Sequence, residues 1–462
     1  MNHNINCMKN SVNYLIFGIL AFSLSFFSCR SDVNSVAVDP TNTKVIGSET
    51  AVLWADMTLF VAKKTASNTP TYASRALGYI GLTMYETVVH GSSTHKSLSG
   101  QLAEMPALTQ PEIGKTYNWV IAMNAGQASI IKKFYPHASE SITGMVTLQA
   151  NEILQAESKN EKSDVITRSI SFGETIANEI FEWSKSDGGH EGYLRNFPTD
   201  YVMPTSPGSW TVPVRGQTSS KLPLHPYWGK NRNLVKSDAF LFTPPMIPHS
   251  DDPQSQCYAQ FLEVYSKNKI LTEEEKEIAV WWSDDPAETV APPGHSYNLA
   301  TITVRKAQPD LFKAAETYAR VGLSVADAFI NCWRCKYTYF SERPAAYIAK
   351  YIDARYVMFW PEPPFPAFMS GHATQAAATA TVLTDLYGNN FAFIDNTHQG
   401  RPDNALRGTA YKPRSFNSFW EAAEESAYSR FLGGIHARQD NEVGLAEGRK
   451  VGRNVNALTW RK

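Results

Sequence analysis

Apolar residues recur three and four positions apart along most of this chain, the spacing that puts them on one face of an α-helix. Five such segments fill the first half: residues 48–65, 73–90, 111–134, 141–157 and 163–186. Short breaks containing Gly, Pro, Ser or His separate them, as expected between helices. Alternation with a period of two, which marks a half-buried strand, is scarce. The pattern therefore predicts helices and little sheet.

The helical pattern stops near residue 190 and resumes near residue 252. The stretch between, GGHEGYLRNFPTDYVMPTSPGSWTVPVRGQTSSKLPLHPYWGK, is rich in Pro, Gly and aromatic residues, which favour irregular structure. No internal repeat of fixed period is present. We therefore predict an all-α protein of two helical bundles, each of the four-helix type. The first bundle spans residues 48–190, the irregular connection 191–250 and the second bundle 251–462.

The N-terminus has the features of an export signal. After Lys9 comes the apolar run YLIFGILAFSLSFF, Tyr14 to Phe27, which is too short for a membrane span but suits a signal peptide. The run ends in FFSC, which resembles a bacterial lipobox with Phe26 where leucine is usual. We expect residues 1–28 to be removed, Cys29 to carry lipid, and residues 29–47 to form a polar linker.

This interpretation predicts an exported protein of a gram-negative bacterium, anchored in the cell envelope and in contact with the membrane only through its lipid; simple secretion is the alternative.

The composition restricts the partners that the protein can have. Lys and Arg number 43 against 44 Asp and Glu, and hydrophobic residues make up 43% of the chain. A globular chain with a net charge of -1 gives no reason to expect a nucleic acid as partner, so any concentrated positive site must be local.

The cysteines do not predict a redox or zinc site. Of the five cysteines, Cys332 and Cys335 form a C-x-x-C pair in NCWRCKY. No strand and turn pattern like that of thioredoxin precedes the pair, and no second pair completes a zinc site. Their oxidation state stays open at this point.

Candidate chemistry instead gathers at predicted helix ends. In KYTYFSERP, Arg343 precedes Pro344 and is therefore pushed out of helical geometry, so Lys336 lies near a helix end and Arg343 on the following turn. In PAFMSGHAT, Ser370 suits an N-cap, and the helix that begins there presents free N–H groups and partial positive charge to an anion.

A third motif is SRFLGGIHARQD, Ser429 to Asp440. Its two glycines cost a helix interior about 1 kcal/mol each relative to alanine, so this is a poor place for them unless the backbone bends or approaches another group closely. A bend would let Arg430 and His436 converge on one centre, although six residues would place them on different faces of an unbroken helix. Asp440 can accept the Nδ1–H of His436 and leave Nε2 free.

Each motif alone has an ordinary explanation: a solvated cation at a helix end, a simple cap, or a surface His and Asp pair. Their conjunction, K-x6-R-P, then S-G-H, then S-R-x5-H-x3-D, resembles the signature that joins vanadium-dependent haloperoxidases, type 2 phosphatidic acid phosphatases and bacterial acid phosphatases. The stretches SDDPAETVAPPGHSYNLA and HPYWGK resemble the secreted bacterial haloperoxidases, including iodoperoxidases and chloroperoxidases. The family fold is largely helical, with two four-helix bundles.

The resemblance implies an oxyanion site formed by the side chains of Lys336, Arg343, Ser370 and Arg430 and the amide of Gly371. It implies that His436 bonds to vanadium, or acts as the nucleophile of a phosphatase. His372 then serves as acid and base beside the bound oxyanion, and Lys336 polarises bound peroxide. Three neighbouring cations support such a site, because they repel one another unless an oxyanion neutralises them.

Peroxidase and phosphatase chemistry need the same donors, so the surroundings must discriminate. Trp333 lies one helical turn before Lys336, and Phe365 just before the S-G-H motif; both resemble the apolar halide side of haloperoxidase sites, although ordinary core packing is the alternative. His295 in PPGHSY is a further candidate for this side.

The sequence therefore predicts a haloperoxidase with vanadate and no haem as cofactor, which oxidises a halide, iodide foremost, with hydrogen peroxide. No organic acceptor is assigned. The alternatives are an acid phosphatase that acts on phosphomonoesters or lipid phosphates through a phosphohistidine, and a non-enzymatic lipoprotein that binds a glycan. A binding protein has no need of His436 with Asp440 and a second histidine.

Overall fold

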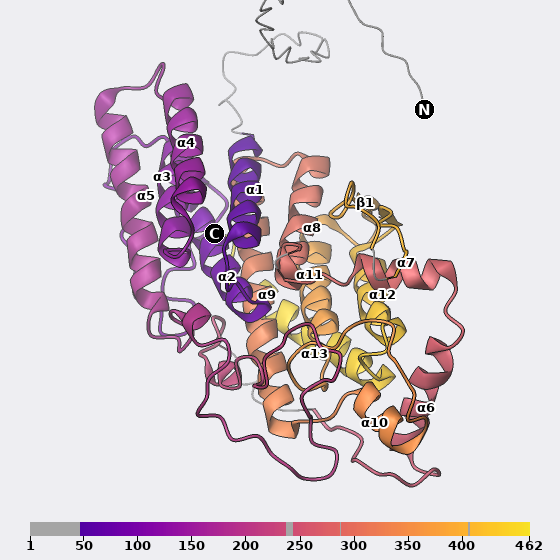
Figure 1. Ribbon diagram of the computed structural model, residues 1–462. Helices are drawn as coiled ribbons and strands as arrows, with labels where there is room; N and C mark the ends of the chain where they lie inside the picture. Colours follow the sequence, from indigo (N-terminus) through magenta and orange to yellow (C-terminus); the bar gives the residue numbers. More distant parts are fainter. Residues whose placement is uncertain (1–46, 237–243, 287, 405–406) are drawn as a thin grey trace, which may run out of the picture. The chain divides into compact units, whose positions relative to one another are not determined.

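The computed structural model describes residues 47–236, 244–286, 288–404 and 407–462 (Figure 1). The predicted signal peptide and Cys29 lie outside these residues. The first half forms helices α1 (Glu49–Lys64), α2 (Pro70–Glu86), α3 (Trp119–Phe134), α4 (Glu140–Glu157) and α5 (Ser163–Ser184), with a short 3-10 turn η1 (Val89–Gly91). The predicted segment 111–134 starts too early, because Asn118 caps α3 by accepting from the Ile121 amide.

In its described residues, the long connection after α5 is irregular apart from the turns η2 (Gly192–Leu194) and η3 (Trp228–Lys230). One segment of it is fixed by Asp327, a fully buried residue of helix α9 (Leu311–Tyr339). The Asp327 carboxylate accepts the amides of Leu234 and Val235 at 2.6 and 3.0 Å. The buried carboxylate thus accepts the two backbone N–H groups that a helix or sheet would otherwise satisfy.

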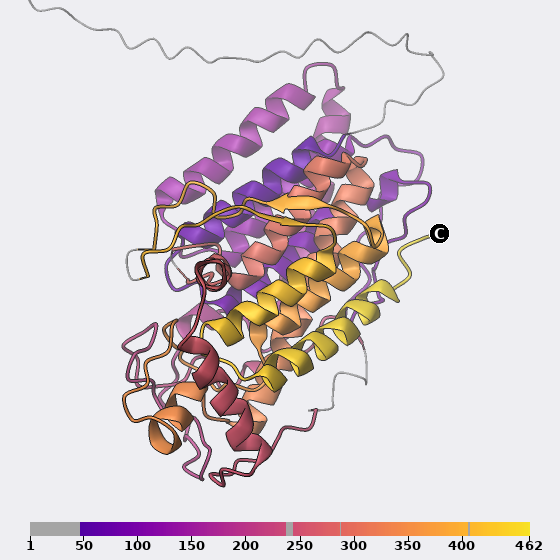
Figure 2. The ribbon, with the colours of Figure 1, turned by 90° about the vertical axis from the view of Figure 1, so that its right-hand side faces the viewer.

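Helices dominate the second half as well (Figures 1 and 2). They are α6 (Gln256–Asn268), α7 (Glu273–Trp281), α8 (Ala291–Ala307), α9, α10 (Pro344–Tyr351), α11 (Gly371–Tyr387), α12 (Phe419–Leu432) and α13 (Arg438–Asn456). The strands β1 (Phe393–Asp395) and β2 (Arg414–Phe416) form a small antiparallel ribbon, seen as arrows in Figure 2. The predicted all-α class is confirmed; the division into two bundles at residues 190 and 250 stays a prediction.

Small residues let α13 lie directly against α11. A Cβ placed on Gly448 would come within 2.0 Å of the Thr374 carbonyl oxygen, and one on Gly444 within 2.9 Å of the Ser370 carbonyl oxygen. Side chains at these positions would push the helices apart. Because α11 begins at Gly371 and α13 begins shortly after His436, this contact brings two of the predicted motifs together.

Among the described residues, no helix combines the length and the apolarity needed to span a membrane. Cys257, Cys332 and Cys335 are free and buried. Cys332 and Cys335 lie within α9, where their side chains belong to the core.

Candidate active site

The first motif lies where α9 ends and α10 begins. Lys336 is fully buried in the last turn of α9, and Phe340 ends the helix in left-handed geometry, with φ +47°. Arg343 is the N-cap of α10 and Pro344 its first residue. The restriction that proline places on the preceding residue therefore holds Arg343 in extended backbone.

The second motif forms the start of α11. Ser370 caps this helix, its hydroxyl accepting from the Ala373 amide. The Ser370 amide itself donates to the main-chain oxygen of Asp440 at 3.0 Å, which fixes the start of α11 to α13. The Gly371 amide is among the N–H groups that a helix leaves without an intrahelical acceptor, so it can bind an anion.

The two glycines of the third motif end α12. The Ile435 amide donates to the Arg430 carbonyl and the Gly434 amide to the Phe431 carbonyl, the two bonds of a Schellman motif. Gly434 has φ +75°, and a Cβ there would meet Asn268 Oδ1 at 2.3 Å. Only glycine satisfies both conditions, so α12 stops and His436 enters the connection to α13.

His436 and Asp440 form a buried pair. His436 Nδ1 lies 2.9 Å from Asp440 Oδ2, while Nε2 faces Arg343 Nη1 at 3.4 Å. Burial and the positive charge of Arg343 hold the pKa of His436 well below its usual range. The neutral ring with Nδ1–H donated to Asp440 keeps a lone pair on Nε2, as a metal ligand or nucleophile requires.

Three buried cations, Lys336, Arg343 and Arg430, surround His436, and we call them the cation site. Each hydrogen-bonds to main-chain carbonyls: Lys336 Nζ to Pro366 and Ala367 at 2.9 and 2.7 Å, Arg343 Nη1 to Ile435 at 2.8 Å, and Arg430 Nη1 to Trp282 at 2.9 Å. Across the described ranges, none of the three forms an ion pair with a carboxylate.

Burial lowers the pKa of Lys336 to about 8 and those of Arg343 and Arg430 to about 10. Two polar atoms at the site also have no partner among the described residues, Arg430 Nε and His372 Nε2. Buried charges and donors without partners are costly. A tetrahedral or trigonal oxyanion would neutralise the charges and accept from these donors, so the residues fit vanadate or phosphate.

A cavity of about 480 Å³ opens onto the site. Gly371, His372, Arg430 and His436 line one part of it, and Trp333 and Phe365 another. The two aromatic rings contact each other, with centroids 4.9 Å apart, and Phe365 lies over both Lys336 and Arg343 at 5.1 and 5.2 Å. The two aromatic residues therefore shield the cations from water on this side.

His295, predicted at the halide side, does not line this cavity. It lies behind Asp284, with its two ring nitrogens at hydrogen-bond distance from Asp284 and Asp395. Both nitrogens are thus engaged by carboxylates of the protein, and the prediction for His295 is corrected accordingly.

Sequence reasoning missed several residues of the site. The irregular connection contributes Gln217 and Leu224 to the cavity wall. Asp285 also lines the cavity, and it accepts from Gln217 Nε2 at 2.7 Å and from Trp360 Nε1. Burial raises the pKa of Asp285 to about 6, against the effect of nearby Arg430. The two adjacent acids in WWSDDP could have indicated Asp285 as a site residue. No sequence pattern in the irregular connection indicates Gln217 or Leu224.

Comparison with known proteins places these features in one family. Residues 355–461 match a family model described as the VCPO second helical-bundle domain. Vanadium chloroperoxidase from Curvularia inaequalis is 24% identical over 359 residues, which cover 59% of this chain and 56% of that protein. The apo structure of a bacterial vanadium-dependent chloroperoxidase, 14% identical with a TM-score of 0.63 over 85% of this chain and 94% of that one, shows the same fold.

A stronger match is the crystal structure described as the first bacterial vanadium-dependent iodoperoxidase. It is 30% identical, with a TM-score of 0.77, and the match covers 91% of this chain and 98% of that one. Identity at this level over nearly the whole length, together with the ordered motifs, establishes common descent. The chain belongs to the vanadium-dependent haloperoxidase family.

Proposed function

We propose that this protein is a vanadate-dependent haloperoxidase that oxidises halide, iodide foremost, with hydrogen peroxide. The observation that carries the proposal is the cation site: three buried cations that form no ion pair among the described residues, arranged around a histidine whose Nδ1 is held by Asp440 and whose Nε2 is directed at Arg343. In the overall reaction the halide gives two electrons to hydrogen peroxide. One peroxide oxygen enters hypohalous acid, the other leaves as water, and one proton is consumed.

His436 Nε2 is the atom that would bond to vanadium, with Asp440 fixing the ring. The cation site, the Ser370 hydroxyl and the Gly371 amide would hold the vanadate oxygens. Bound vanadate supplies the metal centre at which peroxide is activated. His372 lines the cavity, its Nε2 has no partner among the described residues, and we assign it the role of delivering the proton that the reaction consumes.

The cavity wall favours halide over a phosphoester. Trp333 is 1% exposed and forms an apolar surface with Phe365 beside the cations. Such a surface removes water from a small polarisable anion but offers few hydrogen bonds to an ester group. Iodide is the halide most easily oxidised, and the structural relative matched over most of its length is described as an iodoperoxidase.

Reconstitution tests the proposal against phosphatase activity, which needs the same oxyanion donors. Purified apoprotein, with and without vanadate, is assayed for triiodide formation from iodide and peroxide and for hydrolysis of nitrophenyl phosphate. We expect triiodide formation only with vanadate. Hydrolysis by the apoprotein that vanadate inhibits, without any halide oxidation, would instead identify a phosphatase.

We further propose that the protein is lipid-anchored in the cell envelope through Cys29, on the basis of the FFSC sequence after the apolar run. Cys29→Ser should move the mature protein from the membrane fraction to the soluble fraction of its host. Membrane association that persists in this variant would rule out the anchor.

A further inference from the structure

A second cluster of buried charges lies outside the cation site. His295 in α8 has Nδ1 2.9 Å from Asp284 Oδ2 and Nε2 2.8 Å from Asp395 Oδ2. All three side chains are at most 1% exposed. We call these residues the histidine clamp. It joins α8 to the connection between α7 and α8 and to strand β1.

The geometry fixes the charge of His295. A neutral imidazole has one N–H and one lone pair, so one of its nitrogens would face a carboxylate oxygen with no proton between them. Because the pKa values of Asp284 and Asp395 are lowered and both carboxyls are therefore ionised, the two contacts are satisfied only when the ring carries two protons. Although burial opposes the charged form, Asp284 and Asp395 raise the pKa of His295 to about 10, and His295 lowers that of Asp284.

The clamp also holds backbone that is otherwise unfavourable. Asp284 has φ +50°, a left-handed conformation that few non-glycine residues adopt. Its carboxylate accepts from His295 and also lies 2.8 Å from His398 Nε2. Asp395 accepts from Trp281 Nε1 at 2.7 Å. The connection is thus tied at both sides of Trp282.

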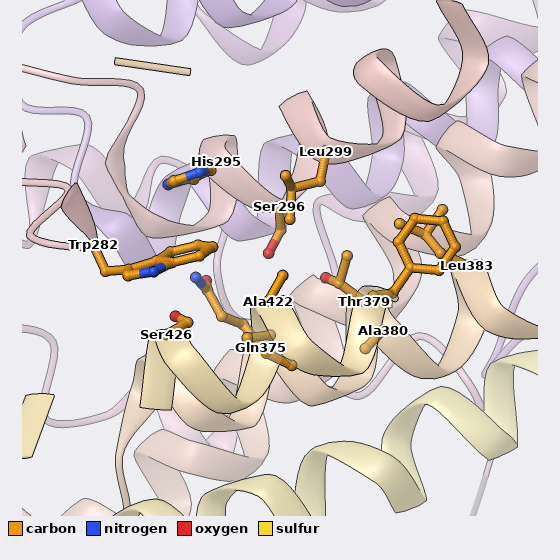
Figure 3. Close-up of a pocket in the computed structure, with 13 residues that line it drawn as sticks. Trp282, His295, Ser296, Leu299, Gln375, Thr379, Ala380, Leu383, Ala422 and Ser426 are labelled. Carbon is orange, nitrogen blue, oxygen red and sulfur yellow. The ribbon is translucent and has the colours of Figure 1, made fainter. Parts of the chain in front are cut away.

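Trp282 links the clamp to the oxyanion donors. Its ring stacks on His295 at 4.5 Å with an interplanar angle of 17°, and Figure 3 shows both side chains at the wall of a small cavity. Its main-chain carbonyl accepts from Arg430 Nη1 at 2.9 Å. This backbone carbonyl therefore orients one residue of the cation site.

We propose that His295 is a positioning residue for the oxyanion site. As an imidazolium between Asp284 and Asp395, it fixes the segment from Trp282 to Asp285, so that the Trp282 carbonyl holds Arg430 toward the bound oxyanion. His295 itself touches neither oxyanion nor halide. The inference rests on the proposed function, since it assumes that Arg430 serves a vanadate site.

The test measures vanadate binding to the apoprotein by calorimetry, with phosphate as a second probe. His295→Gln removes the charge and one of the two donors. We expect vanadate affinity to fall by about 10- to 100-fold, the loss typical when a residue that orients the ligating groups, without touching the ligand itself, is replaced. The double variant His295→Gln with Asp395→Asn should recover most of the loss, because the glutamine amide can donate to Asp284 and accept from Asn at 395. His190→Gln, at a partly exposed position, is the matched control.

Unchanged vanadate affinity in His295→Gln, with only a lower melting temperature, would overturn the positioning role. If this variant does not fold, Asp395→Asn decides: it keeps the ring and should weaken vanadate severalfold, and wild-type affinity there would overturn the proposal. Asp284, His295 and His398 are also close enough to hold a metal ion. If the purified protein contained one equivalent of zinc or iron, and His398→Ala lost it, the cluster would be a metal site and His295 would not be an imidazolium.

These readouts separate the two proposals. A wild-type protein that binds vanadate but does not oxidise iodide would defeat the proposed function, while the affinity of His295→Gln would still decide whether His295 positions the oxyanion donors.

Discussion

The protein contains two buried charge clusters that satisfy the same physical requirement in opposite ways. In the histidine clamp, one imidazolium lies between two carboxylates, and the charges are paired within the protein. In the cation site, Lys336, Arg343 and Arg430 donate to main-chain carbonyls and, among the described residues, form no ion pair, while Arg430 Nε and His372 Nε2 have no partner there. Both clusters are almost fully enclosed.

The difference identifies the ligand site. A buried charge is tolerated when it is paired and hydrogen-bonded, so a cluster that pairs its own charges supports the structure around it. A cluster left with excess charge must obtain its counter-ion from outside. The clamp and the cation site meet at Trp282, which contacts His295 with its ring and Arg430 with its carbonyl.

The largest effect is expected from removing the metal ligand. His436→Ala leaves the cation site in place but deletes the atom that would bond to vanadium. Vanadate-dependent iodide oxidation should fall more than about 100-fold, beyond the range that outer-shell partners alone account for. Turnover is measured at saturating vanadate, with His190→Ala as control. Retained turnover would mean that another residue holds the metal.

The next effect is stabilisation by anions. Vanadate at 100 times its dissociation constant should raise the free energy of unfolding by about 2.7 kcal/mol, because it neutralises the cation site. Scanning calorimetry of the apoprotein measures this, and phosphate should act in the same way and compete with vanadate during reconstitution. Phosphate should still stabilise His436→Ala. An apoprotein whose melting temperature ignores both anions would show that the cations have another counter-charge.

The clamp should respond to pH instead of to anions. Asp284 and Asp395 raise the pKa of His295 to about 10 in the folded state, above the usual value of 6.5. The stabilisation is therefore complete below pH 6.5 and is lost as the pH rises toward 10. Asp284, Asp395 and His398 face the ring, and the two acids stay ionised in this window.

Urea unfolding should show that wild type is more stable than His295→Gln and that this difference in the free energy of unfolding shrinks by about 2 kcal/mol between pH 7 and pH 9. A single titrating group can change the free energy by at most about 2.7 kcal/mol over two pH units. A difference independent of pH would mean that the ring of His295 is neutral.

The smallest effect is expected at the aromatic wall. Phe365→Leu keeps an apolar cover over Lys336 and Arg343 but loses the ring that lies about 5 Å from both cations. A desolvated cation–π contact of this kind contributes about 2 kcal/mol to stability, but it is present with and without bound vanadate and therefore largely cancels from the affinity. We therefore expect vanadate affinity within about fivefold of wild type and a larger change in the KM for iodide. A large loss of vanadate affinity with an unchanged KM for iodide would instead show that Phe365 is only a packing residue.

Local sequence determined most helices and the helix ends that carry the motifs. Pro344 sets the geometry of Arg343, Ser370 caps α11, and Gly434 ends α12, each through interactions within a few residues. Because these signals are short-range, the motifs could be located without knowledge of the tertiary structure. The onset of α3 was missed, since Asn118 cannot be recognised as its cap from periodicity alone.

Only the tertiary structure decided how the site is enclosed and supported. His295 and Asp395 are 100 residues apart, and no local pattern announces that they form a pair. The Trp282 carbonyl that holds Arg430 belongs to the backbone, which is the same in every residue. The cavity wall formed by Gln217 and Leu224 depends on where an irregular segment packs. Contacts of this kind arise from the packing of distant elements, whereas the cation site could be predicted because its residues stand at helix ends that the sequence itself defines.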